Sequence, residues 1–540
     1  MSHSTAAVLL FATPSTMDRV WTQLFDDTFA GIHQPALFDY ALMVPYFTLL
    51  AILSIFGLHR FEILWRYYRN RHKLGQPPKS YFTELPRVTI QLPVYNEQYV
   101  IDQLVEAVSK IEYPRHLLQI QVLDDSTDET TAVCARVVSR YRAMGLPIEL
   151  HHRDNRYGYK AGALEEGLKT ATGEFVAIFD ADFIPPTDFL MRTIHHFTDP
   201  KVGVVQTRWG YTNRDFNLLT EVQAMLLDGH FVLEHGARYA HGDYFNFNGT
   251  AGVLRVSMIR DAGGWQHDTL TEDSDLSYRA QMKGWRFVYL PNVVCPSELP
   301  VEMYSFQTQQ FRWAKGLTQV ACKLLPDLFR SNASWHVKVQ AALHLIPNVS
   351  YPMMIGISAL ILPVMIVRFY MGWFEFLLLD VPVMTACFLS LIAFYCAAQR
   401  ELHPRTWKRS ILFIPALMAV GVGLTFINTK AFLEAIFGVK SSFVRTAKYA
   451  IAGKVKVTEK ARRYKRPSGL LPWLEIAAGS YFVGTLVWAV DSFQFLCIPF
   501  LTLFVGGYYW AGFVTLYEEY RGQWRSAPKA LPMETIKAQD

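Results

Sequence analysis

The sequence predicts an α/β domain joined to an α-helical transmembrane bundle. Two observations support this prediction. Within residues 80–300, strand-like and helix-like segments alternate along the chain, and outside this range the apolar residues gather in six long stretches. A chain of 540 residues also exceeds the usual size of one domain, so at least two compact units are expected.

Each apolar stretch is close to the length that a helix needs to cross a bilayer, about 20 residues. Five of the six contain no Asp, Glu, Lys or Arg, and the other contains only Glu475. Six such uncharged helices in the core of one soluble protein would be an improbable arrangement, so we predict an integral membrane protein. The stretches are residues 40–58, 339–367, 381–398, 411–429, 470–490 and 492–517.

Basic residues predict the orientation of the chain, because Lys and Arg are enriched in cytoplasmic loops. Segments 60–73, 400–409 and 440–466 are rich in them, whereas residues 1–36 contain only Arg19. We therefore expect the N-terminus outside the cell and the α/β domain in the cytoplasm.

The position of the basic segment 440–466 conflicts with one membrane crossing for every apolar stretch. A single crossing by 411–429 would place the basic segment 440–466 outside, so we interpret 411–437 as interfacial, re-entrant or doubly crossing. The predicted segments are an extracytoplasmic segment (1–36), a transmembrane helix (37–59), a cytosolic α/β domain (80–300), interfacial helices (301–335), transmembrane or re-entrant helices (339–437), a basic cytosolic loop (438–468), two transmembrane helices (470–517) and a cytosolic tail (518–540).

The α/β domain is expected to hold a mostly parallel sheet covered by helices, because its strands alternate with helices. In such sheets, ligands bind beyond the carboxyl ends of the strands. The predicted strands are 88–94, 118–125, 148–154, 174–182 and 202–209, and the predicted helices are 98–111, 128–143 and 160–171.

Acidic residues follow three of these strands, in segments 93–97, 124–126 and 180–182. Crowded carboxylates repel one another and are costly unless a cation or hydrogen-bond donors balance them. A hard divalent cation together with a substrate diphosphate would do so, since such ions bind a few carboxylates and phosphate oxygens. The cysteines and histidines show no metal-ligand spacing, so no zinc site is predicted.

Eight short motifs follow one another along the chain: PVYNE (93–97), DDSTD (124–128), KAGA (160–163), DAD (180–182), VQTRW (205–209), FNGT (247–250), TED (271–273) and QQFRW (309–313). With these motifs, the chain resembles the family 2 processive glycosyltransferases of the cellulose synthase superfamily, and most of all the cellulose-synthase-like glucomannan and glucan synthases. The resemblance covers roughly residues 88–450. It implies a glycosyltransferase A-type, Rossmann-like domain that polymerises a β-linked glucan or mannan with inversion and moves the product across the membrane.

The resemblance also implies where the donor and the metal bind. Asp182 would bind Mg²⁺ or Mn²⁺, whose role is to offset the charge that grows on the nucleoside diphosphate. Donor-binding residues would be Tyr95, Glu97, Asp125, Lys160, Asp180, Gln309, Arg312 and Trp313.

The TED motif carries the expected catalytic residues, Thr271, Glu272 and Asp273. An inverting transfer needs one base to take a proton from the acceptor hydroxyl, and by resemblance Asp273 would be that base. Its pKa should lie nearer neutrality than that of a surface aspartate. Thr271 is also a good helix N-cap, which would place the base.

The acceptor sugar is expected near Asn248, Gly249 and Trp313. Phe443, Thr446 and Lys448 resemble the family's gating loop, although Arg445 replaces a valine there. A basic loop bound to anionic lipid headgroups is the open alternative for 454–466.

Several points stay open from the sequence alone. UDP-glucose is slightly favoured over GDP-mannose as donor. A single-transfer enzyme acting on a membrane lipid is one alternative, and a transporter with a nucleotide-binding domain is a more distant one. The expected partners are the nucleotide sugar, a polysaccharide acceptor and membrane lipids. No nucleic acid is expected, and the oligomeric state is undetermined.

Overall fold

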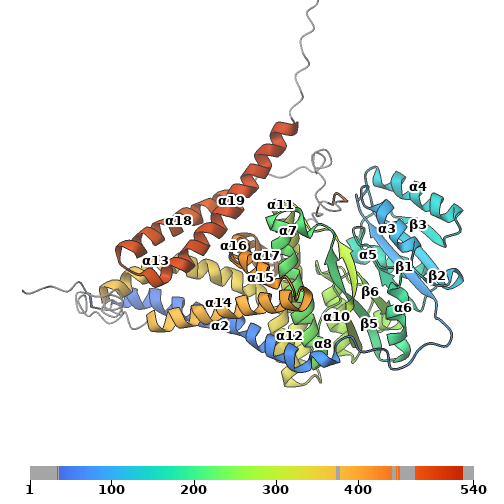
Figure 1. Cartoon of the computed structure of the whole chain (residues 1–540), viewed down its shortest axis with the longest axis horizontal. Helices are drawn as coiled ribbons and strands as arrows, with labels where there is room; N and C mark the ends of the chain where they lie inside the picture. Colours follow the sequence, from blue (N-terminus) through green and yellow to red (C-terminus); the bar gives the residue numbers. More distant parts are fainter. Residues whose placement is uncertain are drawn as a thin grey trace, which may run out of the picture.

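The computed structural model shows an α/β domain at one end of the molecule and an elongated helical bundle at the other (Figure 1). The structure describes residues 33–34, 36–371, 377–440, 446, 448–450 and 469–526. Most of the predicted N-terminal segment, most of the basic loop with Phe443, and the end of the C-terminal tail lie outside the described residues.

The α/β domain is built on a seven-stranded sheet with the strand order β3-β2-β1-β4-β6-β5-β7. Strand β1 is parallel to β2 and β4, β2 is parallel to β3, and β5 is parallel to β7. Strand β6 alone runs antiparallel to both its neighbours. The strands are β1 (Val88–Val94), β2 (Leu118–Asp124), β3 (Ile148–His152), β4 (Phe175–Ile178), β5 (Val202–Tyr211), β6 (Gly252–Arg255) and β7 (Arg286–Ser297).

Helices cover both faces of this sheet, which confirms the predicted fold class. Strands β6 and β7 were not predicted. Strand β6 has only four residues, and β7 is interrupted by Pro291 and Pro296, which weaken its strand pattern. The helices of the domain are α3 (Ile101–Ser109), α4 (Thr130–Ala143), α5 (Tyr159–Thr170), α6 (Phe189–Thr193), α7 (Leu218–Asp228), the π-helical segment η5 (Gly229–His235), α8 (Gly236–His241), α9 (Val256–Asp261) and α10 (Glu272–Met282).

Two apolar cores hold the helices to the sheet. Alternate residues of a strand point to opposite faces, and in β4 Phe175 and Ala177 pack into one core while Val176 and Ile178 pack into the other. Helices α3 and α4 contribute to the first core and helices α5, α9 and α10 to the second. Helices are therefore packed on both faces of the sheet.

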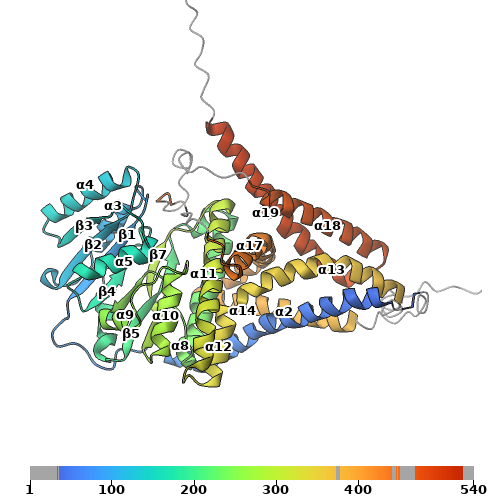
Figure 2. The same ribbon diagram turned by 180° about the vertical axis from the view of Figure 1, so that it is seen from behind.

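The remaining helices form the bundle and its junction with the α/β domain (Figure 2). Helix α11 lies between the two parts in both views. These helices are α2 (Leu37–Asn70), α11 (Met303–Arg330), α12 (Trp335–Leu345), α13 (Ser350–Met371), α14 (Leu377–Leu402), α15 (Trp407–Ser410), α16 (Ile414–Gly423), α17 (Thr425–Ile436), α18 (Leu471–Asp491) and α19 (Ile498–Ser526).

Among the described residues, five helices are long and apolar enough to cross a membrane: α2, α13, α14, α18 and α19. The remaining apolar stretch of the sequence, 411–429, behaves differently. It is divided between the segments 407–423 and 425–436, which meet at an angle of 42°.

Contacts at both ends of this bent pair involve the side of the molecule that carries the α/β domain. Before the pair begins, His403 Nε2 lies 3.2 Å from Arg214 Nη1 of that domain. Near its end, Glu434 Oε2 accepts a hydrogen bond of 2.7 Å from Lys315 Nζ of α11. In between, Leu417 of α16 shares a buried cluster with residues of α7. Both ends of the pair therefore contact the α/β domain or α11, as expected if 411–437 is interfacial, re-entrant or doubly crossing.

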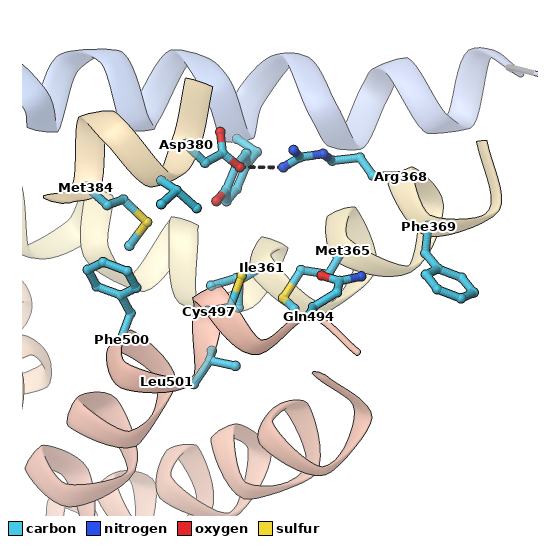
Figure 3. A pocket seen from close by; sticks show the side chains of 12 residues that line it. Ile361, Met365, Arg368, Phe369, Asp380, Met384, Gln494, Cys497, Phe500 and Leu501 are labelled. Atoms are coloured by element: carbon cyan, nitrogen blue, oxygen red, sulfur yellow. Dashed lines mark hydrogen bonds and ion pairs between the residues drawn. The ribbon is translucent and has the colours of Figure 1, made fainter. Parts of the chain in front are cut away.

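A mostly apolar pocket lies within the bundle, between α2, α13, α14 and α19 (Figure 3). Arg368 and Asp380 form an ion pair in its wall. Two opposite charges that face each other in this way avoid much of the cost of a lone charge in a bilayer. None of the predicted site residues lines this pocket.

The path of the bent pair leads to a testable expectation for side-specific labelling. Single cysteines at the exposed positions Arg405 and Lys440 should both react with a membrane-impermeant maleimide only from the side of the α/β domain. Asp491→Cys, at the end of α18, is the matched control and should react only from the other side. The exposed Cys322 is replaced by serine in all variants. Labelling of positions 405 and 440 from opposite sides would show that the pair crosses.

Candidate functional site

A cleft opens at the carboxyl ends of β1, β2 and β4, between α5, α10 and α11. Every predicted site residue that the structure describes lines it, whereas Phe443 lies outside the described residues. The structure thus brings together Tyr95, Glu97, Asp125, Lys160, Asp180, Asp182, Asn248, Gly249, Thr271, Glu272, Asp273, Gln309, Arg312, Trp313, Thr446 and Lys448.

One wall of the cleft is formed by the segments that follow β1 and β2. Arg153 binds both oxygens of Asp125, at 2.7 and 2.5 Å. The guanidinium of Arg156 lies 3.2 Å from the centroid of the Tyr95 ring. Next to Tyr95, Asn96 has a φ of +54°, a conformation that asparagine tolerates better than most residues. The result is a planar, well-fixed surface suited to a flat ring.

Lys160, in the first turn of α5, lies at the centre of the cleft. Its Nζ donates to Asp180 Oδ1 at 2.5 Å and to the carbonyl oxygen of Gly249 at 3.0 Å. Burial by itself lowers the pKa of Lys160, but attraction from Asp180 and Glu272 outweighs it and leaves this pKa raised. The ammonium group therefore stays charged.

Asp182, the predicted metal ligand, faces a second ammonium group. Lys448 Nζ lies 2.6 Å from Asp182 Oδ2 and 2.6 Å from the carbonyl oxygen of Glu298. The backbone N–H of Glu298 also donates to Asp182 Oδ2, at 3.2 Å. Glu298 was missed in the sequence, because it follows the unpredicted strand β7 and carries no motif.

Asp273, the predicted base, lies in the first turn of α10. Its Oδ1 accepts a hydrogen bond of 2.7 Å from the backbone N–H of Ser274. Its Oδ2 faces Gly249, where a Cβ atom would lie only 2.8 Å away. Since Gly249 also has a φ of +78°, glycine fits this position both in conformation and in space.

Two carboxyl groups next to each other shift the proton equilibria of the cleft. Burial, and then repulsion from Glu272, raise the pKa of Asp273 to about 7. Burial likewise raises the pKa of Glu272, although Lys160 opposes it. For Arg312, burial lowers the pKa against the attraction of Glu272 and Asp180. A carboxyl with a pKa near 7 can both accept and hold a proton at neutral pH.

Thr271 occupies the N-cap position of α10 as predicted, but its side chain makes no capping hydrogen bond. The predicted cap interaction is therefore wrong. Gly316 of α11 packs so closely that a Cβ there would lie 2.5 Å from Thr271 Cγ2. This packing holds Thr271 Oγ1 in a buried position without a hydrogen-bond partner in the described structure.

Asn248 is held by a chain of polar contacts that the sequence did not reveal. His230 Nδ1 lies 2.8 Å from Glu234 Oε2, and His230 Nε2 lies 3.1 Å from Asn248 Nδ2. If the amide N–H donates to Nε2, the ring proton is on Nδ1 and points to Glu234. Burial raises the pKa of Glu234, but His230 outweighs it and brings this pKa to about 2. Single π-helical turns such as η5 are frequent at functional sites.

The cleft contains buried polar atoms that lack a hydrogen-bond partner within the described structure, and four of them matter for ligand binding. They are Trp209 Nε1, Asn248 Oδ1, Thr271 Oγ1 and Thr446 Oγ1. Buried polar atoms in native proteins are nearly always hydrogen-bonded. The indole N–H of Trp209 can only donate and Asn248 Oδ1 can only accept, whereas the two threonine hydroxyls can do both. This combination suits a ligand rich in hydroxyl groups.

Helix α11 contributes Gln309, Arg312 and Trp313 to the cleft and is fixed from the bundle side. Glu518 of α19 accepts hydrogen bonds from the first backbone N–H groups of α11, at 2.9 and 3.4 Å. Gln307 Nε2 donates to Glu475 of α18 at 3.0 Å. Carboxylates near a helix N-terminus are favourable because they satisfy its unpaired N–H groups.

The charges of the cleft fit a divalent cation. Seven acidic side chains line it against four basic ones, so an anionic diphosphate would not be attracted without a further cation. Two lysines already face the acidic pair Asp180 and Asp182, in the place where a hard cation would bind oxygen ligands. The donor set therefore suits Mg²⁺ or Mn²⁺.

Residues 86–316 match the family model described as glycosyltransferase like family 2. The chain carries a family 2 glycosyltransferase domain. The domain includes every described residue of the cleft from Tyr95 to Trp313. This match confirms the resemblance and the expected glycosyltransferase A-type fold.

Named relatives of the family 2 domain include two plant proteins. Glucomannan 4-beta-mannosyltransferase 1 of Oryza sativa subsp. japonica is 42% identical over 276 residues, which cover 50% of this chain and 52% of that protein. Glucomannan 4-beta-mannosyltransferase 9 of Arabidopsis thaliana is 44% identical over 236 residues, which cover 43% of this chain and 44% of that protein. The chain thus spans about half the length of the curated relatives it matches.

Among solved structures, the mannosyltransferase PcManGT from Pyrobaculum calidifontis, in complex with GDP-Man and Mn²⁺, is 25% identical. The match covers 66% of this chain and 99% of that one, with a TM-score of 0.46.

The raised pKa of Asp273 predicts how stability depends on pH. Because the folded state holds this proton up to about pH 7, it binds more protons than the unfolded chain above pH ~4, so the contribution of Asp273 to stability falls as pH rises to 7. Asp273→Asn removes this loss and should raise Tm relative to wild type more at pH 8 than at pH 5. Thermal unfolding measured at both pH values tests this, with the exposed Asp215→Asn as control. Parallel profiles for wild type and Asp273→Asn would contradict the shift.

Proposed function

We propose that the protein is a processive, inverting glycosyltransferase that polymerises a β-linked mannan or glucomannan from a nucleotide sugar. One observation carries this proposal: the cation-balanced carboxylates, the near-neutral Asp273 and the α11 residues share a single cleft, and α11 itself packs against the bundle. The positive-inside rule supports a cytoplasmic location for this cleft, where nucleotide sugars are available.

In this proposal the donor binds along the strand ends. Its base lies against Tyr95 and Arg156, since flat rings stack on aromatic and guanidinium planes. Asp125, locked by Arg153, accepts hydrogen bonds from the base or ribose. Mg²⁺ or Mn²⁺ held by Asp182 would offset the charge that grows on the diphosphate as it leaves. Lys160 and Arg312 supply further fixed positive charge beside the same group.

Asp273 then acts as the base. Its carboxylate takes the proton from an acceptor hydroxyl, the hydroxyl oxygen bonds to the anomeric carbon, and the bond from that carbon to the diphosphate oxygen breaks with inversion. Ser274 N–H fixes one carboxylate oxygen, and Gly249 leaves the other uncrowded. Asn248, Trp209 and Thr271 offer their unpaired polar atoms to sugar hydroxyls.

The donor preference is revised from the slight lean toward UDP-glucose. The plant relatives named above are mannosyltransferases, so we propose GDP-mannose as the preferred donor.

Polymer formation is proposed from the position of α11. Trp313 offers an apolar ring face at the cleft on a helix that is anchored to α18 and α19, and sugar rings pack well on such faces. A growing chain that leaves Asp273 past Trp313 would therefore enter the bundle. Transfer to a lipid without polymerisation is the alternative outcome.

A donor panel tests the reaction. Membranes containing the protein are incubated with labelled GDP-mannose, GDP-glucose, UDP-glucose and UDP-N-acetylglucosamine, with Mg²⁺ or Mn²⁺. GDP-mannose should give a large product that a β-1,4-mannanase degrades, and a chelator should abolish it. A product of lipid size would favour single transfer, and incorporation from UDP-sugars alone would reject the donor assignment.

The base is tested by Asp273→Asn, which should lower kcat ~10²–10⁴-fold, the contribution of a positioned base. Donor binding, measured by isothermal titration of GDP-mannose, should survive. With the pKa of Asp273 raised to about 7 by burial and by Glu272, the wild-type rate should rise with pH toward a plateau above 7. Full polymer synthesis by the variant would remove Asp273 from the mechanism.

The contacts of His230 predict a positioning role. His230→Leu removes the acceptor of the Asn248 amide, at a cost of about one hydrogen bond, and should lower kcat ~10-fold. The KM for the donor should stay unchanged, because His230 does not line the cleft. The exposed His116→Leu is the control and should behave as wild type. If His230→Leu instead lowers both Tm and the affinity for the donor, its role is merely structural.

A further inference from the structure

A cluster of two histidines and one aspartate lies at the junction of the α/β domain and the helices beside it. His241 ends α8, Asp243 follows it, and His336 lies in the first turn of α12. None of the three lines the cleft. Gly242, with a φ of +87°, turns the chain so that His241 and Asp243 face the same point.

The spacing of the ligand atoms matches a tetrahedral metal site. His241 Nδ1 lies 3.3 Å from His336 Nε2 and 3.3 Å from Asp243 Oδ2, and His336 Nε2 lies 3.0 Å from Asp243 Oδ1. Nitrogen and oxygen ligands bind Zn²⁺ at about 2.0–2.1 Å. Two such ligands at a tetrahedral angle are about 3.3 Å apart. One ion could therefore contact all three residues with little movement of their side chains.

Hydrogen bonding leaves these atoms poorly satisfied. The side chain of Asp243 is only 2% exposed, and its Oδ1 lies 3.0 Å from His336 Nε2 but makes no hydrogen bond in the described structure. Three polar atoms crowd His336 Nε2: Arg66 Nη1 at 2.8 Å, Asp243 Oδ1 at 3.0 Å and His241 Nδ1 at 3.3 Å. A ring nitrogen has one in-plane direction for a hydrogen bond, so His336 Nε2 can form a hydrogen bond with only one of these three atoms.

We propose that His241, Asp243 and His336 bind one Zn²⁺ ion that fastens α8 of the glycosyltransferase domain to α12. Two imidazoles and one carboxylate are a ligand set that zinc uses, with a fourth position left for water. The oxygen-rich cleft, in contrast, suits a harder ion. The two sites therefore differ in the metal they select.

Arg66, near the end of α2 that faces the α/β domain, occupies the place that the cation would take. Its Nη1 lies 2.9 Å from Asp243 Oδ2, and its Nε also donates to Glu62 at 3.1 Å. When zinc binds, Arg66 can keep its bond to Glu62 and release Asp243. The guanidinium is thus a competitor whose removal strengthens metal binding.

The site was not predicted, because residues 241 and 336 are far apart in the sequence and only the fold brings them together. The adjacent pair at 151–152 has the simpler spacing, but its two side chains pair with Glu149 and Asp124 instead.

The test uses the full chain in detergent, without a polyhistidine tag and with excess Mg²⁺ to occupy the cleft. Equilibrium dialysis against Zn²⁺ followed by elemental analysis should give about one zinc per chain. Co²⁺ in its place should show the intense visible bands of a tetrahedral ion. His336→Ala and Asp243→Asn should each lose the bound metal and the bands, while the control His151→Ala keeps both.

Arg66→Gln should increase the affinity for zinc, a result that misfolding of the variant cannot produce. It should bind Zn²⁺ about ten-fold more tightly than wild type, the effect of removing one competing charged hydrogen bond. Zinc should also raise Tm in wild type and not in His336→Ala. The proposal is overturned if wild type binds no zinc, if His336→Ala and Asp243→Asn bind as much as wild type, or if Arg66→Gln binds less.

Discussion

Helix α11 packs against both the α/β domain and the helical bundle, and the geometry of the cleft depends on both sets of contacts. On one side, Gly316 lets α11 pack directly on Thr271, next to the predicted base. On the other, Glu475 and Glu518 from the last two helices of the bundle hold its first turns. A shift of the bundle would therefore move Arg312 and Trp313 relative to Asp273. The geometry of the cleft and the packing of the bundle are coupled through one helix.

Charge balance is the second constraint on the cleft. Carboxylates gathered at strand ends are unfavourable unless cations face them, and here two lysines do so from separate parts of the chain. Lys160 belongs to the helix after β3, whereas Lys448 reaches Asp182 from beyond α17. A cation at Asp182 would therefore compete with Lys448 for the same carboxylate.

Much of the fold and of the cleft could be predicted from the sequence. The parallel strands carry continuous apolar runs and the acidic motifs follow their ends, so the motifs alone could assign Asp182 and Asp273 to one cleft. The sequence did not predict the features that depend on tertiary packing. The antiparallel β6 is too short to show a pattern. Thr271 makes no capping hydrogen bond, and its close contact with Gly316 of α11 joins segments far apart in the sequence. Glu298, His230 and the His241 cluster depend on contacts between distant segments, which no local pattern reports.

The buried ion pair of Arg368 and Asp380 in the bundle has a consequence for biogenesis. These residues are in the last turn of α13 and the first turn of α14, only twelve positions apart. A lone charge costs about 2.5–3.5 kcal/mol to insert at the centre of a membrane helix and less near a helix end, where these two residues lie. Together they neutralise each other within one helical hairpin. The two helices are therefore suited to leave the translocon as a pair, and a charge-neutral hairpin can partition into the bilayer before the rest of the bundle assembles around it.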